Sequence, residues 1–363
     1  MSEQHTDSDR EAQRLLRRRR RRRLYRLRQR VIELCILAVL VVGVVILVRS
    51  LLPDRQPADI SPADESVPSG SESNETEEKT PYPVITADTV QLGDTVNAEY
   101  AVLLDVTDNR VVAAKGADTV AYPASVTKVL TLLVAAEHIT DYTETYEMSY
   151  TFLNDLYLQQ ATVAGFSSGE RVNMTDLLYG CILPSGADAT IALANHLAGS
   201  EEAFAGMLNA KAAELGLKNT HFVNSSGLHD RDHYTTALDM AMVLAAAMEN
   251  ETCRRVLSTY QYTTAATPQH PEGLLLTSTM FSRMYGDEPE GAVIVAGKTG
   301  YTAQAGNTMA SYAQGDDGHD YIFVSMKGSD KWKATYDAIN IYTAFCGPVG
   351  VEESAIPQAI QPP

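Results

Sequence analysis

Three short segments of the sequence combine residue types that could carry out acyl transfer. The first is Ser125-Val126-Thr127-Lys128, in which a serine and a lysine three positions apart share one face of a helix, so that Oγ and Nζ can meet. A desolvated lysine loses its proton readily and can act as a general base. The stretch 126–138 is largely apolar, so a helix there would bury Lys128, which is unusual for a lysine without a role. Ser125 is the candidate nucleophile and Lys128 its candidate base.

Each of the other two segments is weak evidence of a catalytic site by itself, but the order of all three along the chain is informative. Ser185-Gly186-Ala187 interrupts two helical stretches and could present a hydroxyl into a cleft. Lys298-Thr299-Gly300 ends a predicted strand, where Gly300 would let a substrate backbone approach closely. Singly, these segments also fit a helix cap, a turn and a strand end. The order S-x-x-K, serine loop, K-T-G narrows the reading to serine acyl transfer.

The elements that must position these residues follow from periodicity and turn signals. The pattern predicts strands at 98–106, 110–114, 292–296, 308–313 and 320–326, and helices at 126–138, 174–183, 188–197, 201–215, after Thr236, and at 333–345. Strands at both ends of a chain usually share one sheet with helices on its faces. We therefore expect an α/β (α+β) fold, with an antiparallel sheet flanked by helices and an all-helical subregion.

Charge is distributed very unevenly along the 363 residues. The whole chain carries −17, but residues 1–30 carry +8, residues 31–52 are neutral, residues 53–83 carry −6 and the remainder carries −19. The acidic balance argues against nucleic acid as a partner. An arginine run could also be a nuclear signal or an RNA-binding arm, but here it directly precedes an apolar stretch, which favours a topology signal.

This pattern predicts a membrane-anchored protein. We expect a cytoplasmic Arg-rich arm at 1–30, a single N-terminal transmembrane helix at 31–52, a disordered acidic Pro/Ser linker at 53–83, a catalytic domain at 84–349 and a flexible tail at 350–363. No small-x-small site follows the apolar run, so an uncleaved anchor is favoured over a signal peptide. The domain at 84–349 should then lie on the extracytoplasmic side of the membrane.

Several blocks of sequence resemble one known family in the same order. The matching blocks are Tyr122–Thr131, Leu183–Ala189, Phe222–Leu228, His233–Ala241 and Gly297–Thr302. Together they are similar to the serine-type D-alanyl-D-alanine carboxypeptidases, the low-molecular-mass penicillin-binding proteins, which share the serine β-lactamase fold. The resemblance covers about residues 84–346 and implies a domain that removes the terminal D-alanine from peptidoglycan stem peptides and is acylated by β-lactams.

The resemblance also implies a role for each candidate residue. Ser125 would be acylated, Lys128 would be its base, and Ser185 would relay a proton to the leaving D-alanine. Lys298, Thr299 and Thr302 would hold the substrate's terminal carboxylate, with Gly300 between them. The backbone N–H groups of Ser125 and Tyr301 would form the oxyanion hole.

The sequence departs from the family at Ala187, where the second motif usually has asparagine. This motivates one alternative, a catalytically weak cell-wall-binding or scaffolding module. A β-lactamase is a second alternative, of the same class as a carboxypeptidase, and is disfavoured because no convincing glutamate-containing loop lies between Ser185 and Lys298. We also expect no additional β-rich C-terminal domain.

No cofactor and no metal are expected. His229-Asp230-Arg231-Asp232-His233 places two histidines and two aspartates within five residues, but a polar loop is favoured over a metal site. Cys181, Cys253 and Cys346 are scattered and odd in number, which favours buried free thiols. Cys35 falls in the predicted membrane span.

Overall fold

The computed structural model describes residues 82–284 and 286–346. The chain divides into two units, Met1–Thr76 and Glu77–Pro363, and every described residue belongs to the second. The predicted arm, membrane span and tail, and nearly all of the linker, lie outside the described residues. Among the residues that are described, no helix is long and apolar enough to cross a membrane.

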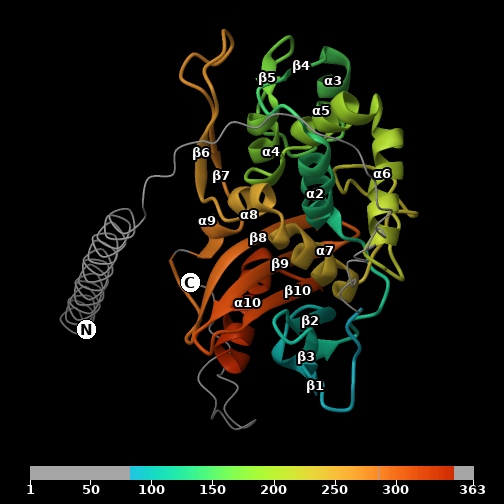
Figure 1. Ribbon diagram of the computed structural model, residues 1–363, viewed down its shortest axis with the longest axis vertical. Helices are drawn as coiled ribbons and strands as arrows, with labels where there is room; N and C mark the ends of the chain where they lie inside the picture. Colours follow the sequence, from blue (N-terminus) through green and yellow to red (C-terminus); the bar gives the residue numbers. More distant parts are fainter. Residues whose placement is uncertain (1–81, 285, 347–363) are drawn as a thin grey trace, which may run out of the picture. The chain divides into compact units, whose positions relative to one another are not determined.

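A six-stranded sheet forms the base of the domain (Figure 1). Its order is β1-β3-β2-β10-β9-β8, so the strands from the two ends of the domain meet, as predicted, where β2 pairs with β10. The strands are β1 (Val90–Gln91), β2 (Tyr100–Asp105), β3 (Arg110–Lys115), β8 (Ala292–Thr302), β9 (Gly306–Gly315) and β10 (Asp320–Gly328). The prediction of a purely antiparallel sheet is wrong at one edge, because β1 runs parallel to β3. A two-residue strand is too short to give a periodic signal.

Both faces of the sheet are covered, which divides the core in two. Side chains alternate along β2: Ala101 and Leu103 face one cluster, and Val102 and Leu104 face the other. The first cluster is closed by α10 (Lys331–Phe345) and the second by the larger helical region. Because both faces are buried, the strand is apolar at nearly every position.

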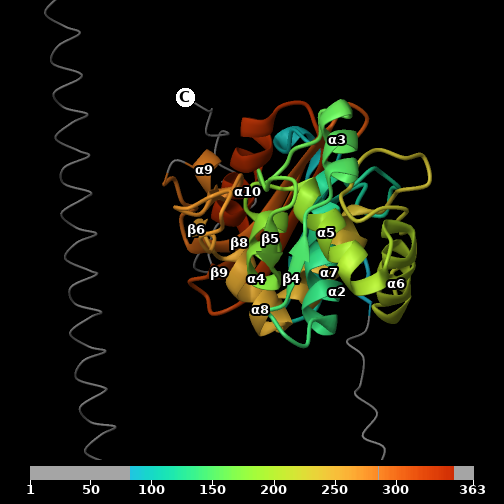
Figure 2. The ribbon, with the colours of Figure 1, turned by 90° about the horizontal axis from the view of Figure 1, so that it is seen from above.

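The helical region packs on one face of the sheet and extends past one end of it, and Figure 2 views the domain from that end. Its helices are α2 (Lys128–His138), α3 (Tyr150–Leu158), α4 (Met174–Ile182), α5 (Ala187–Ala198), α6 (Glu201–Glu214), α7 (Ala237–Glu249) and α8 (Glu251–Leu257). The 3-10 helices η1 (Gly93–Thr95) and η2 (Ala124–Thr127), the short helix α9 (Phe281–Met284) and two small hairpins, β4 (Thr145–Glu147) with β5 (Arg171–Asn173) and β6 (Gln261–Thr263) with β7 (Leu275–Thr277), complete the domain. Of these, α3, α8, α9 and both hairpins were not predicted.

Local chemistry explains several boundaries. The hydroxyl of Thr236 accepts a hydrogen bond from the N–H of Asp239 at 3.0 Å, which is the predicted cap of α7. Tyr82, assigned above to the linker, belongs to the folded domain, since its hydroxyl donates to Asp239 at 2.6 Å.

Cys181, Cys253 and Cys346 are free and buried, as predicted.

Candidate active site

The first motif lies where η2 runs into α2. The predicted helix 126–138 is divided there, so Ser125 lies within the 3-10 turn rather than at the first residue of an α-helix. One helical turn still separates Ser125 from Lys128, and Nζ lies 3.0 Å from Oγ. Lys128 is only 2% exposed, which confirms the predicted burial. The candidate nucleophile and its candidate base are therefore already in contact.

The surroundings of Lys128 favour its neutral form. Burial is the main cause of the lowering of its pKa to about 8. Its Nζ also donates to the backbone carbonyl of Ser226. A neutral amine that donates to this carbonyl keeps a lone pair that can accept the proton of Ser125 Oγ. The arrangement can activate a serine by general-base catalysis.

The second motif forms a tight turn between α4 and α5. Ser185 is buried and adopts φ +69°, a left-handed conformation that is uncommon for a residue with a side chain. The turn is fixed by its backbone, because Gly186 N–H donates to Gly180 and Ala187 N–H donates to Thr162. Within the described chain, the Ser185 hydroxyl makes no hydrogen bond with the side chains of Ser125, Lys128 or Lys298.

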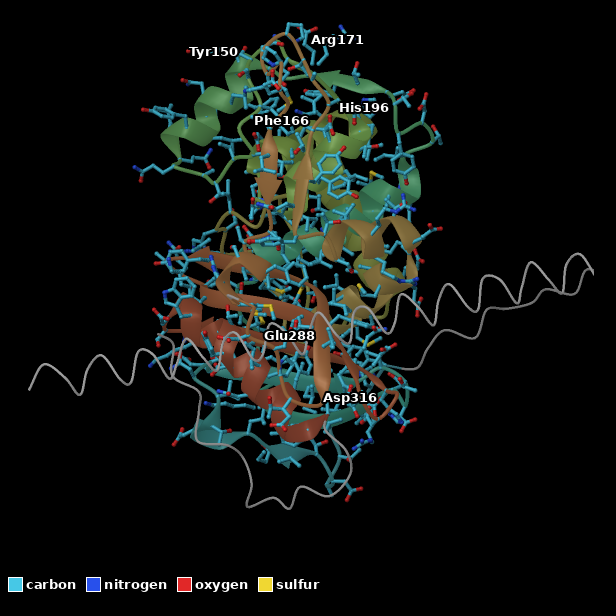
Figure 3. All side chains as sticks on the ribbon, turned by 90° about the vertical axis from the view of Figure 1, so that its left-hand side faces the viewer. Tyr150, Phe166, Arg171, His196, Glu288 and Asp316 are labelled. Carbon is cyan, nitrogen blue, oxygen red and sulfur yellow. The ribbon has the colours of Figure 1, made fainter. Side chains whose placement is uncertain are left out.

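A carboxylate fastens the neighbouring strap, residues 162–166, against this turn. The fully buried side chain of Asp188 accepts hydrogen bonds from the N–H groups of Ala164, Gly165 and Phe166 at 2.7, 3.0 and 3.3 Å. Phe166, labelled in Figure 3, lies in the helical part of the domain with Tyr150 and His196. Asp188 therefore holds the strap beside Ser185.

The third motif lies on β8, the last strand at one edge of the sheet. Lys298 is 1% exposed and donates to the Thr299 carbonyl at 2.7 Å. Burial and the nearby Lys128 hold the pKa of Lys298 well below its usual value. No carboxylate in the described part of the chain pairs with Lys298. An incoming carboxylate would supply that missing counter-charge and favour the protonated lysine.

Gly300 also has a requirement within the protein itself. A Cβ at this position would lie 2.8 Å from the backbone nitrogen of Ser125 and 2.4 Å from Thr308 Oγ1. The close approach of β8 to the Ser125 turn of the same protein therefore requires glycine here. This contact brings the third motif against the first. Tyr301 is 64% exposed and Thr302 is partly exposed at the outer end of the strand.

Three further side chains lie at this site that the motifs did not predict. Thr279 donates its N–H to the Leu183 carbonyl, next to the Ser185 turn, and its hydroxyl bonds that of Thr299 at 2.8 Å. Arg283, on α9, is close enough to contribute to the low pKa of Lys298. His233 is buried within hydrogen-bond distance of Thr127. Of these, only His233 lies in a block of sequence that resembles the family, His233–Ala241, and so could have been found from the sequence.

The aspartate–histidine segment 229–233 does not gather into a metal-binding group. Among the described residues, one set of acidic and histidine side chains comes together, namely Asp105, Asp108 and His319, at the turns joining strands of the sheet. The Asp105 carboxylate there is already occupied by His319 Nδ1 at 3.0 Å and the Asp108 N–H at 3.1 Å. Asp105 thus pairs with His319 and caps the turn that contains Asp108.

Comparison with known proteins adds three findings. A family model described as D-alanyl-D-alanine carboxypeptidase matches residues 86–330. The chain is 33% identical over 172 residues to the D-alanyl-D-alanine carboxypeptidase DacF of Bacillus subtilis, covering 45% of this chain and 42% of that protein. It is 32% identical over 230 residues to DacC of Escherichia coli, covering 61% of this chain and 54% of that protein. The chain thus spans about half the length of these curated relatives.

The fold agrees with a solved structure. The crystal structure of the Streptomyces K15 DD-transpeptidase superimposes with a TM-score of 0.60 at 26% identity, covering 68% of this chain and 97% of that one. The sheet and the helical region of this chain therefore follow the fold of that structure.

Proposed function

Because this chain belongs to the D-alanyl-D-alanine carboxypeptidase family, we propose that it removes the terminal D-alanine from peptidoglycan stem peptides through an acyl-enzyme on Ser125. The observation that carries the proposal is the contact of Lys128 Nζ with Ser125 Oγ, 3.0 Å apart, by a buried lysine whose pKa is lowered to about 8. A serine and a neutral lysine in contact are the minimum needed to begin acyl transfer.

The proposed steps assign one role to each of these side chains. Lys128 accepts the proton of Ser125 while Oγ attacks the carbonyl between the two D-alanines. The proton taken up by Lys128 passes through the Ser185 hydroxyl to the leaving amine, so Ser185 regains the proton it gives, and D-alanine departs. Water then attacks the Ser125 ester, and its proton passes through Lys128 back to Ser125 Oγ as the shortened peptide leaves. The N–H groups of Ser125 and Tyr301 stabilise the oxyanion, and such a donor is worth roughly 3 kcal/mol.

Recognition of the substrate is assigned to β8. The strand is the outermost of its sheet, so an extended peptide can align beside it. Lys298, with the hydroxyls of Thr299 and Thr302, is proposed to bind the terminal carboxylate. β-Lactams, which carry a carboxylate and a reactive amide, would acylate Ser125 by the same route.

The test is release of D-alanine from diacetyl-Lys-D-Ala-D-Ala by the full chain in detergent. Ser125→Ala should abolish release, because the ester can no longer form. Ser329→Ala, in the loop before α10, is the matched control and should leave release unchanged. Undiminished release by Ser125→Ala would defeat the assignment of the nucleophile.

We also propose that residues 31–52 anchor the protein in the bacterial cell membrane, with 1–30 in the cytoplasm and the catalytic domain outside. The support is the apolar run that follows an arginine-rich segment. The full chain should sediment with membranes, and Leu40→Arg with Val45→Arg should release it. External protease should digest the domain in intact spheroplasts. Protection of the domain there would contradict this orientation.

Ala187 supports a second candidate function, that of a weakly catalytic cell-wall-binding module. Its side chain is a buried methyl at the start of α5, where the family usually has an amide. Labelling by a fluorescent penicillin separates the two candidates. A wild-type protein that is not labelled, with labelling appearing in Ala187→Asn, would favour the binding module. Rapid turnover of a chromogenic cephalosporin would instead indicate a β-lactamase.

A further inference from the structure

The residue before the nucleophile has an unfavourable backbone conformation. Ala124 adopts φ +49°, in the left-handed region that residues with a side chain seldom occupy. Such a conformation persists only where the surroundings enforce it. The two carbonyl groups that precede Ser125 are both held by threonine hydroxyls: Thr308 donates to Pro123 at 3.0 Å, and Thr127 donates to Ala124 at 2.8 Å.

The Thr127 hydroxyl is in turn oriented by His233. The imidazole is 2% exposed, and burial lowers its pKa to about 4, so the ring is neutral near pH 7. Val223 N–H donates to Nδ1 at 3.2 Å, so Nδ1 carries no proton and Nε2 carries one. Nε2 then donates to Thr127 Oγ1 at 2.8 Å. This leaves the threonine proton directed at the Ala124 carbonyl.

We propose that His233 is a positioning residue for acylation, and that the relay from Val223 N–H through His233 and Thr127 to the Ala124 carbonyl keeps the Ser125 turn strained and aligned. The inference rests on the proposed function, in which Ser125 supplies both the nucleophile and an oxyanion donor. It also gives His233 a use other than the metal binding considered from the sequence.

Two close contacts explain why a small change in this turn would matter. A Cβ on Gly227 would lie 1.9 Å from the Ala124 oxygen, and one on Gly300 would lie 2.8 Å from the Ser125 nitrogen. The backbone of the Ser125 turn is thus in close contact with Gly227 on one side and Gly300 on the other. If the Ala124 carbonyl loses its donor, relaxation of φ moves the Ser125 N–H and Oγ together. Misplacement of reacting groups by about 1 Å can cost about 10²-fold in rate.

The experiment measures acylation of the full chain by a fluorescent penicillin, with D-alanine release as the second readout. Thr127→Val keeps the shape and removes the hydroxyl, and it should lower the acylation rate and kcat by about 10²-fold with KM nearly unchanged. Thr127→Ser restores the hydroxyl and should approach the wild-type rate. His233→Leu should resemble Thr127→Val, and the double variant should be no slower than either, because all three interrupt the same relay.

Ala124→Gly provides a test specific to this mechanism. Glycine adopts a left-handed φ without a steric penalty, so this change should recover part of the rate lost in Thr127→Val. A role of His233 in folding alone would not produce that rescue. Thermal unfolding of each variant shows whether the protein is folded; if His233→Leu does not fold, Thr127→Val with Thr127→Ser decides the matter.

The outcomes separate this inference from the proposed function. Wild-type acylation at an unchanged rate in folded Thr127→Val would overturn the positioning role and leave the proposed function intact. Additive losses in the double variant would also overturn it. A wild-type chain that neither reacts with penicillin nor releases D-alanine would defeat the proposed function and the positioning role with it.

Discussion

The two serine turns at the site are built in different ways. Each contains a residue in the left-handed region, Ala124 at φ +49° beside Ser125, and Ser185 itself at φ +69°. The Ser125 hydroxyl already contacts Lys128 Nζ at 3.0 Å. The Ser185 turn is fixed through its backbone, while its hydroxyl makes no hydrogen bond to Lys128 or Lys298 in the described structure.

This difference indicates that the two halves of the reaction are prepared to different degrees. The groups that begin acylation are in contact before substrate arrives, so little rearrangement is needed. The group assigned to proton delivery is held nearby and must form its hydrogen bonds with the substrate present. Catalytic hydrogen bonds that tighten only in the substrate complex are common.

The largest effect should come from removing the base. Lys128→Met keeps the length and apolar packing of the side chain and removes the amine. Acylation by penicillin should fall by about 10³–10⁴-fold, near the upper range for general-base catalysis. Stopped-flow acylation of the full chain measures this. A loss below tenfold would mean that another group activates Ser125, and that the contact with Lys128 is incidental.

A second prediction tests whether the Ser125 turn depends on close packing. Gly300→Ala would place Cβ 2.8 Å from Ser125 N, so β8 or the turn must shift, and acylation should fall by about 10²-fold. Gly206→Ala is the matched control, because Gly206 lies in α6 with no atom within 4 Å of the added Cβ.

The control should leave acylation unchanged and increase the free energy of unfolding by about 0.5–1 kcal/mol through helix propensity. Equal acylation rates in the two alanine variants would contradict the claim that the turn depends on close packing. Chemical denaturation supplies the stability values.

Removal of the Ser185 hydroxyl should have a smaller effect than removal of the Lys128 amine. Ser185→Ala should lower D-alanine release by about 10²-fold, at the lower range for proton transfer, without the deeper loss expected of Lys128→Met. Release of D-alanine is compared with the rate of acylation by penicillin. If Ser185→Ala equals Lys128→Met in both assays, the two turns act as one unit and the contrast between them fails.

The smallest effect is a dependence on pH. The base must be neutral, and burial lowers the pKa of Lys128 to about 8, so the neutral fraction rises from about one tenth at pH 7 to about one half at pH 8. Acylation should therefore increase about fivefold over that unit and level off above pH 9. Rates of penicillin acylation from pH 6 to 10 test this. A profile that falls with rising pH would assign the lowered pKa to a different group.

Much of the fold could be predicted from sequence because the longer elements repeat strongly. The stretch 126–138 is largely apolar, and residues 321–324 form a continuous apolar run, and both elements were found near those positions. The short elements failed for a physical reason. β1 has two residues and β4 to β7 have three each, so tertiary contacts rather than local pattern decide their conformation.

The residues of the site likewise divide into those that a sequence motif predicts and those that only tertiary contacts bring together. Ser125, Lys128 and Lys298 could be found because each lies in a motif with fixed spacing. Thr279 and Arg283 lie in a segment without a motif, and only the packing of α9 and its preceding loop brings them near β8. The reason for Gly300 could not be predicted either, because it depends on a contact with Ser125 N from a distant part of the chain.

The three buried thiols give this protein internal reporters of local opening. Cys181 lies in α4 with its sulfur 3.9 Å from the Lys128 carbonyl, Cys253 lies in α8, and Cys346 follows α10. Burial raises the pKa of the first two to about 12 and that of the third still further, so none reacts while its surroundings are closed. The rate at which a thiol reagent modifies each one therefore measures how often that region opens. The free energy of opening the structure beside Lys128 can be read separately from that of opening around Cys253 and around Cys346.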